Sequence, residues 1–229
     1  MLAKLFMFSD RSDAGRRLAA KLRRYAGSNP VVLALPRGGV PVALEVARAL
    51  NAPLDVVLVR KIGAPFQPEL AAASVAEGNP PVLIRNHEVL AAFGLDDAFL
   101  QDEQARQLAE IDRRRLAYLG GRPRLALKGR TAIVVDDGIA TGATARAALE
   151  SVRRQHPAFI VLAAPVAAPE TVALLRPLID EAVILAVPDD LGSIGFYYRD
   201  FRQLTDEDVT ALLAQAPTGD NSNRRASAG

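Results

Sequence analysis

The sequence predicts an α/β fold in which a doubly wound, mainly parallel sheet carries helices on both faces. Three observations lead to this class. Apolar runs such as Thr131 to Val135 are typical of strands buried on both faces of a parallel sheet. Helical patterns alternate with these runs, as successive βαβ units require. The chain of 229 residues is 50% hydrophobic, so it can enclose a substantial core.

The individual elements follow in order. A first helix is expected over 10–25, where apolar residues recur at helical spacing and Ser9 or Ser12 can cap the start. Further helices are expected over 40–50, 142–154 and 169–175. The predicted strands, five or six of which should form the parallel sheet, cover residues 31–35, 54–59, 80–84, 131–135, 159–164 and 182–187.

Residues 86–121 are predicted to form a polar helical insertion beside the sheet. Asp96 and Asp97 open its main helix, Arg113 to Arg115 lie near its end, and Gly120 stops it, in the order that a helix dipole favours. We expect the insertion to cover a site or to form a subunit contact. Residues 1–216 are predicted to be a single domain with a small C-terminal hood over 188–216, and the polar residues 217–229 a disordered tail.

Composition excludes several classes of protein. The chain has 28 basic and 26 acidic residues, a net charge of +2 that does not demand nucleic-acid binding. It has no cysteine, which excludes disulfide scaffolds and thiol catalysis. No apolar run approaches a membrane-spanning length, and the apolar start, Met1 to Phe8, is too short for a signal peptide and is expected to pack on the fold. A cytoplasmic location is therefore expected.

The most informative segment joins the strand that ends at Val135 to the helix that follows. Asp136 and Asp137 come directly after the strand, and the small-residue loop 138–144 leads into the helix. Small side chains let backbone N–H groups surround an anion, and a helix N-terminus favours a phosphate. Two carboxylates would repel that phosphate, and they suit hydroxyl groups or a divalent metal. A ribose 5-phosphate offers both chemistries.

Two other interpretations of this segment are a purely structural turn and a nucleotide-binding loop. Asp and Thr are ordinary helix-capping residues, so a plain strand-turn-helix is the structural alternative. A Walker-type nucleotide loop is excluded, because no Gly-Lys-Ser/Thr follows the glycines.

The segment resembles the signature of the type I phosphoribosyltransferases, whose fold is a Rossmann-like sheet. In that family the two acids hold the ribose hydroxyls of 5-phosphoribosyl-1-pyrophosphate (PRPP), and the loop holds its 5-phosphate. The resemblance implies that Asp136 and Asp137 contact the ribose. It also implies a phosphate loop made of Ile139, Ala140, Thr141, Gly142, Ala143 and Thr144. Gly138 departs from the family, many of whose members have an aliphatic residue there.

Two other predicted strand ends suit a pyrophosphate. Arg37, Gly38 and Gly39 form a glycine-rich turn with a guanidinium group, in the place where the family binds pyrophosphate, often over a strained or cis peptide. Arg60 and Lys61 follow the next strand, and paired cations match the charge of a pyrophosphate. Adenine phosphoribosyltransferases show a similar Arg-Lys pair. For Arg37 the alternative is a tight turn with a surface arginine.

Residues 63–79, which contain Pro65, Pro68 and Gly78, resemble the mobile loop that closes over PRPP in this family. Glu69 and Glu77 lie in or beside it. Either could contact the incoming nucleophile, but we expect both to be solvated surface residues.

The predicted hood carries the candidates for acceptor binding. Four of the twelve aromatic residues lie within 188–201, and three in succession cannot all face one core. Phe196 or Tyr197 is expected to stack on a planar acceptor, with core packing as the alternative, and Asp189 could bind an exocyclic amine. His87 and His156 are expected to be exposed caps and not catalytic groups.

These features together predict a PRPP-dependent glycosyltransferase of nucleotide metabolism. It would transfer the 5-phosphoribosyl group to a nitrogen nucleophile, with a nucleobase as the expected acceptor, and release pyrophosphate. Asp136, Asp137, Arg60 and Lys61 are the predicted catalytic residues. Mg²⁺ is the implied cofactor, held by Asp136 and Asp137 largely through PRPP and water. A homodimer is expected, and neither nucleic acid nor a membrane is an expected partner.

Two other functions are compatible with the same fold. A regulator that senses PRPP or binds RNA would keep 136–144 but could lose Arg60, Lys61 and the closing loop, all of which are present. A PRPP-making pyrophosphokinase should carry a duplicated fold, and no repeat is apparent. The resemblance spans most of 31–187 and leaves the acceptor undetermined, because fold alone does not decide function.

Overall fold

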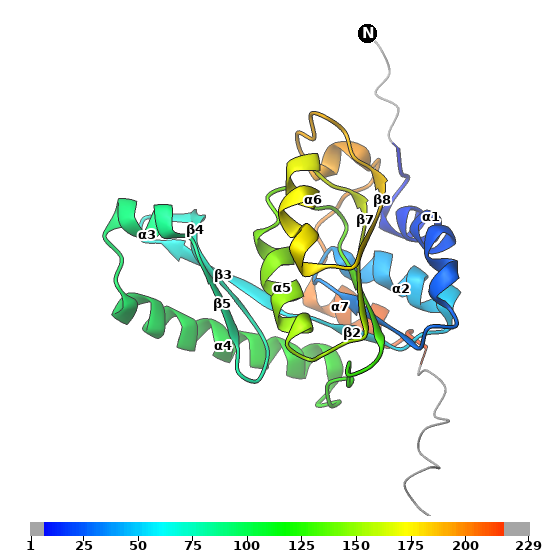
Figure 1. The fold of residues 1–229 in the computed structure, drawn as a ribbon, viewed down its shortest axis with the longest axis horizontal. Coiled ribbons are helices and arrows are strands. Elements are labelled where there is room, and N and C mark those ends of the chain that lie inside the picture. Colours follow the sequence, from blue (N-terminus) through cyan, green and yellow to red (C-terminus); the bar gives the residue numbers. More distant parts are fainter. Residues whose placement is uncertain (1–6, 218–229) are drawn as a thin grey trace, which may run out of the picture.

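The computed structural model describes residues 7–217, and its centre is a five-stranded parallel sheet (Figure 1). The strand order is β2-β1-β6-β7-β8, and every neighbouring pair is parallel. These strands are β1 (Pro30–Ala34), β2 (Leu54–Val56), β6 (Thr131–Val135), β7 (Phe159–Val166) and β8 (Glu181–Ala186). Every residue of β1, β2 and β6 is buried, which explains their continuous apolar sequences.

Helices cover both faces of this main sheet, as the sequence predicted. On one face α1 (Arg11–Leu22) and α2 (Gly39–Leu50) pack on side chains such as Val32 and Ile133, and α7 (Asp206–Leu213) packs on α2. On the other face α5 (Ala143–Arg153) and α6 (Pro169–Leu175) pack on alternate residues such as Val31 and Val134. Short 3-10 helices cover Arg23–Tyr25, Arg176–Leu178 and Ile194–Tyr197.

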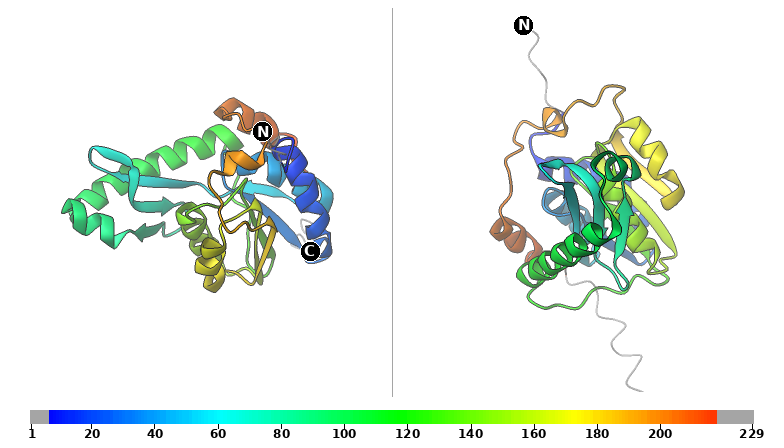
Figure 2. Two further views of the ribbon diagram at one scale, coloured as in Figure 1. Left: turned by 90° about the horizontal axis from the view of Figure 1, so that it is seen from above. Right: turned by 90° about the vertical axis from the view of Figure 1, so that its left-hand side faces the viewer.

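A second unit projects from the edge of the main sheet, and we call residues 59–119 the arm (Figures 1 and 2). It contains an antiparallel sheet of β3 (Val59–Ala64), β4 (Gln67–Ala76) and β5 (Val82–Arg85). Two helices follow, α3 (His87–Phe93) and α4 (Asp97–Leu119). The long helix α4 packs along β3 and returns to contact α7, so the arm is joined to the main sheet at its base.

Several sequence predictions about the arm need correction. Residues 63–79 were predicted to be a loop, but most of them form the β3-β4 hairpin, in which Ala64 pairs with Gln67. The strand predicted over 80–84 exists, but it pairs antiparallel with β4 and does not join the parallel sheet. The strand predicted over 54–59 stops at Val56, and Val59 already belongs to the hairpin.

The caps of α4 match the sequence pattern, whereas His87 is exposed as expected but is not a cap, because Asn86 caps α3 by accepting from Val89 N. Asp96 caps α4 by accepting a hydrogen bond from Phe99 N, and Gly120 ends the helix in the left-handed conformation. At the first helix, however, the cap is Asp10, which accepts from Asp13 N at 2.7 Å, and not Ser9 or Ser12. The predicted packing of residues 1–6 and the predicted disorder of 218–229 lie outside the described residues.

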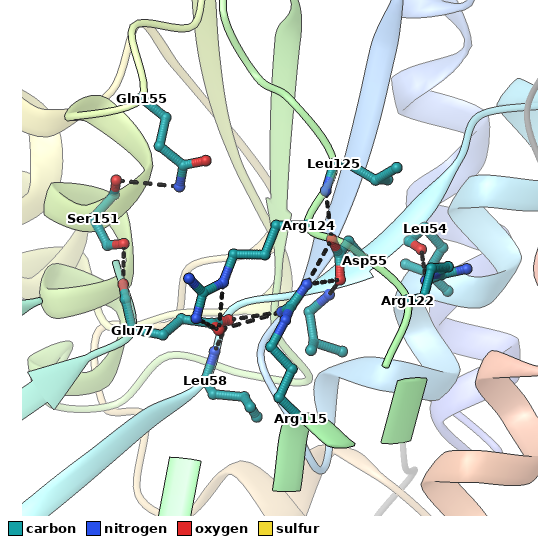
Figure 3. A network of polar contacts seen from close by, with 11 residues as sticks. Leu54, Asp55, Leu58, Glu77, Arg115, Arg122, Arg124, Leu125, Ser151 and Gln155 are labelled. Carbon is teal, nitrogen blue, oxygen red and sulfur yellow. Dashed lines mark hydrogen bonds and ion pairs between the residues drawn. The ribbon is translucent and has the colours of Figure 1, made fainter. Parts of the chain in front are cut away.

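The base of the arm contains a buried network of ion pairs (Figure 3). Arg115 of α4 bridges two carboxylates that are almost fully buried, Glu77 after β4 and Asp55 in β2, with N–O distances of 3.2 Å. Arg124 binds the same Glu77 at 2.9 Å. Backbone N–H groups also donate to the two carboxylates, Leu58 N to Glu77 and Leu125 N to Asp55. The expectation that Glu77 is a solvated surface residue is therefore wrong, whereas Glu69 is exposed.

Candidate active site

Two loops meet at the carboxyl edge of the main sheet, and their contact defines the candidate site. Asp136 and Asp137 follow β6, and the Gly38-Gly39 turn follows the neighbouring strand β1. The turn lies so close that a Cβ on Gly38 would be 2.0 Å from Oδ2 of Asp137, and one on Gly39 would be 2.6 Å from the carbonyl oxygen of Val135. Glycine is therefore required at both positions, because only its backbone can approach the acids this closely.

The two acids are in an electrostatically unfavourable environment. Burial raises the pKa of Asp136 well above its ordinary value, and the nearby charge of Asp137 raises it further. Burial also raises the pKa of Asp137, whereas the guanidinium group of Arg11 opposes that rise. Carboxyl groups with raised pKa values at the end of a sheet are typical of functional sites.

The predicted phosphate loop is anchored at its first residue and exposed in its middle. Ile139 N donates to Val166 O at 2.9 Å, and Ala168 N donates to Ile139 O at 3.0 Å, which ties the loop to the end of β7. Gly142 has a φ of 74°, and a Cβ there would lie 2.5 Å from Cγ2 of Thr171, so this position also requires glycine. Thr141 is exposed, and α5 begins at Ala143.

Two clefts open on this loop. The cleft between the arm and the start of α5 has a volume of about 430 Å³, and its lining includes Ser74, Thr141, Gly142 and Arg146. The other lies between the loop, α6 and the residues after β8, with a volume of about 580 Å³. Thr141 lines both clefts, so the loop is accessible from the arm side and from the hood side.

The predicted pyrophosphate cations occupy different places. The peptide bond between Pro36 and Arg37 is cis, and the Arg37 side chain is 40% exposed, with Nη1 at 3.8 Å from Asp206 of α7. Arg60 and Lys61 are neighbours on β3, so their side chains lie on opposite faces of the small sheet. The role of these two cations toward a pyrophosphate stays a prediction.

Arg60 lies on the face toward α4. Its Nε donates to Oε1 of Gln107 at 3.0 Å, and burial lowers the pKa of its guanidinium group. Both Arg60 and Arg37 are close enough to Tyr118 to interact with it electrostatically. Lys61 is exposed and pairs across the ladder with Ser74, which lines the arm-side cleft. The structure therefore places Arg60 toward α4, and Lys61 on the opposite face of the small sheet.

The predicted hood residues lie in different surroundings. Asp189 lines the hood-side cleft together with Thr141. Phe196 is 56% exposed, whereas Tyr197 is partly buried against the cluster of Phe8 and Tyr198. Phe196 thus keeps an accessible ring, and Tyr197 follows the alternative of core packing. The hood role of all three residues stays a prediction.

Two residues at the site could not be identified from the sequence. Arg11, at the start of α1, places Nε at 2.7 Å from Oδ2 of Asp137, and Tyr198 donates its hydroxyl hydrogen to the carbonyl oxygen of Asp137 at 2.6 Å. For Tyr198 a signal existed, because it lies in the aromatic cluster that the sequence shows. No local pattern indicates Arg11, since it is 126 positions from its partner.

Comparison with known proteins gives the family. The doubly wound parallel sheet, with an acid pair and an anchored small-residue loop at its carboxyl edge, defines the chain as an α/β protein. A model of the phosphoribosyl transferase domain matches residues 9–184, and the chain therefore belongs to that family.

The most informative relatives are similar over nearly the whole chain. A Thermus thermophilus protein known as TT1426 has a crystal structure with 47% sequence identity and a TM-score of 0.76, over 91% of this chain and 98% of that one. Two Mycobacterium tuberculosis proteins, provisionally named phosphoribosyl transferases Rv0571c and MT0597, are each 47% identical over 92% of this chain. This chain covers 47% of their length, so it spans about half of the curated relatives that it matches.

Two further features bear on the class of site. Across residues 7–217 no helix is both long and apolar enough to cross a membrane. Within the same range no group of three or more His, Cys, Asp or Glu side chains is arranged to hold a metal ion. The oxygen donors of Asp136 and Asp137 suit Mg²⁺, but the protein alone does not supply a full set of ligands.

Proposed function

We propose that this protein transfers the 5-phosphoribosyl group of PRPP to a nitrogen nucleophile, with a nucleobase as the expected acceptor, and releases pyrophosphate. The observation that carries the proposal is the contact between the Gly38-Gly39 turn and the two acids. A ribose held by Asp136 and Asp137 would have its 1-pyrophosphate next to that turn. Family membership and the anchored loop 139–144 support the same assignment.

In this proposal the protein works by positioning and by electrostatics. The loop 139–144 anchors the 5-phosphate with backbone N–H groups, and Asp136 and Asp137 hold the ribose hydroxyls. The bond between C1 and the pyrophosphate oxygen breaks as the nucleophile approaches, through an oxocarbenium-like transition state. Arg37, Arg60 and Lys61 neutralise charge on the departing pyrophosphate. Carboxylates near the ribose also stabilise the positive charge that develops on it.

Mg²⁺ fits this site as an ion that the protein and PRPP would bind together. Asp136 and Asp137 would hold it largely through water and the ribose hydroxyls, since no three-residue metal group exists among residues 7–217. When bound, the ion would neutralise charge on the pyrophosphate.

The test is release of pyrophosphate from PRPP with purines, pyrimidines and amines as acceptors. We expect release with one acceptor class and its loss in the double variant Asp136→Asn, Asp137→Asn, which keeps the shape of both side chains. Arg17→Ala, a change on the exposed face of α1, is the control. Undiminished PRPP turnover in the double variant would contradict the proposal.

A PRPP-sensing regulator, or an RNA-binding protein on this fold, is the alternative from another class. The presence of Arg60, Lys61 and a well-formed arm favours the enzyme. PRPP binding without pyrophosphate release for any acceptor would support the regulator instead.

A further inference from the structure

Arg11 makes three contacts at once. Its Nε is 2.7 Å from Oδ2 of Asp137, its Nη1 donates to the carbonyl oxygen of Arg202 at 2.9 Å, and its guanidinium carbon lies 3.9 Å from the ring centre of Phe201. The side chains of Arg11 and Asp137 are only 11% and 14% exposed. An arginine held on three sides cannot sample many rotamers, so it fixes the carboxylate that it binds.

Both ends of the chain contribute to this arrangement. Phe8 forms a parallel bridge with Tyr198, and Phe8 N donates to Tyr197 O at 2.9 Å. Tyr198 stacks on Phe201, with ring centres 4.9 Å apart, and its hydroxyl group binds the backbone of Asp137. The segment before α1 and the segment after β8 therefore hold Asp137 by its side chain and by its main chain.

Charge explains why such a support is needed. Asp136 and Asp137 are adjacent acids at a buried sheet edge, and the charge of Arg11 acts favourably on both. Without that cation, Asp137 would lose its partner at 2.7 Å and would be able to rotate away from Gly38. A carboxyl group that accepts hydrogen bonds from ribose hydroxyls must be fixed in direction.

We propose that Arg11 is a positioning residue that holds the carboxyl group of Asp137 in the orientation that binds the ribose hydroxyls of PRPP. This inference rests on the proposed function and adds a residue to that site. Arg11 acts through Asp137 and does not itself contact the substrate. Its loss should therefore weaken recognition of the ribose and leave recognition of an isolated phosphate unchanged.

The experiment measures dissociation constants for two probes by NMR titration, PRPP with Mg²⁺ and inorganic phosphate. We expect Arg11→Ala to weaken PRPP binding by about 10- to 100-fold, the usual effect of losing a group that orients a ligand-binding residue. Inorganic phosphate binding should be unchanged, because the loop 139–144 is not touched by the substitution. No acceptor is needed for either measurement.

Arg17→Ala is a matched control, because Arg17 lies on the same helix, pairs with Asp13 at 2.9 Å and is 53% exposed. It should bind both probes as the unaltered protein does. Arg11→Lys keeps the charge but loses the planar fork, so it should weaken PRPP binding by a smaller factor, and it serves as the test if Arg11→Ala does not fold.

The outcomes distinguish a failure of the proposed function from a failure of the role assigned to Arg11. Failure of the unaltered protein to bind PRPP would overturn the proposed function and this inference with it. Normal PRPP binding in Arg11→Ala, or an equal loss for both probes, would overturn the inference alone. Tighter PRPP binding in that variant would also overturn it, because Arg11 would then compete with the ribose for Asp137.

Discussion

Asp136 is a residue whose buried position has a cost in stability. Because burial and the charge of Asp137 raise its pKa, the folded protein binds this proton more tightly than the unfolded chain does. Stability therefore falls as the pH rises from the ordinary pKa of an aspartate through the raised pKa of Asp136, and the full penalty remains at higher pH.

This leads to a prediction for the single variant Asp136→Asn. At about pH 8 it should be more stable than the unaltered protein by about 1 kcal/mol, because the charged group is removed and the shape is kept. At acidic pH, where Asp136 is protonated in both states, the two proteins should be equally stable. Urea unfolding at both pH values measures this, and a constant difference across the range would contradict it.

Gly38 gives a second prediction at the residue scale. Gly38→Ala places a methyl group 2.0 Å from Oδ2 of Asp137, so either the acid or the turn must move. We expect a loss of about 1–3 kcal/mol in stability, typical of overpacking, together with weaker PRPP binding. Gly27→Ala is the control, because nothing lies within 4 Å of its added Cβ. Equal unfolding midpoints for the two variants would show that the turn adapts freely.

The residues that sequence could identify are those whose signal is local. Asp136, Asp137 and the loop 139–144 form one continuous pattern, and Gly38 and Gly39 lie in one turn. Arg11 and Glu77 could not be placed in this way, because their environments are created by partners far along the chain. Arg11 meets Asp137 across 126 positions, and Glu77 meets Arg115 across 38 and Arg124 across 47.

At the scale of elements, the network of Asp55, Glu77, Arg115 and Arg124 decides how the arm is attached (Figure 3). It joins β2 of the main sheet, the end of β4 and the end of α4. Buried carboxylates are tolerated only with such partners, so the loss of one guanidinium group would leave a buried charge without compensation.

We predict that Arg115→Ala destabilises the protein by about 3 kcal/mol, because it leaves two buried carboxylates short of a counter-charge. Arg113→Ala is the matched control on the same helix, since Arg113 is 58% exposed and pairs with Glu110. It should have no measurable effect. Urea unfolding of both variants tests this, and similar midpoints would show that Arg124 alone satisfies the network.

The main elements were predictable because buried parallel strands have an unmistakable apolar pattern. The hairpin was not, because Pro65, Pro68 and Gly78 favour a loop and the exposed half of β4 has no alternation to reveal it. β5 has an ordinary strand sequence, and only its partner shows that it belongs to the small sheet.

At the scale of the whole molecule, a ligand that binds only the folded state stabilises all of it. At 100 times its dissociation constant, PRPP with Mg²⁺ should add about 2.7 kcal/mol. For a chain of this size that corresponds to a rise of roughly 5–10 °C in Tm. Thermal unfolding measures the shift, and the Asp136→Asn, Asp137→Asn variant should lose most of it. An equal shift in that variant would place PRPP at another site.

The support of Asp137 by Arg11 and Tyr198 has a consequence for how the protein is made. Its contacts join Arg11 to Arg202 across 191 positions and Asp137 to Tyr198 across 61. During synthesis from the N-terminus, the five strands of the main sheet emerge before Tyr198 and Arg202 do. A nascent chain can therefore complete its sheet while Asp137 is still unsupported. The orientation of this carboxyl group would then be fixed only after the main sheet is complete.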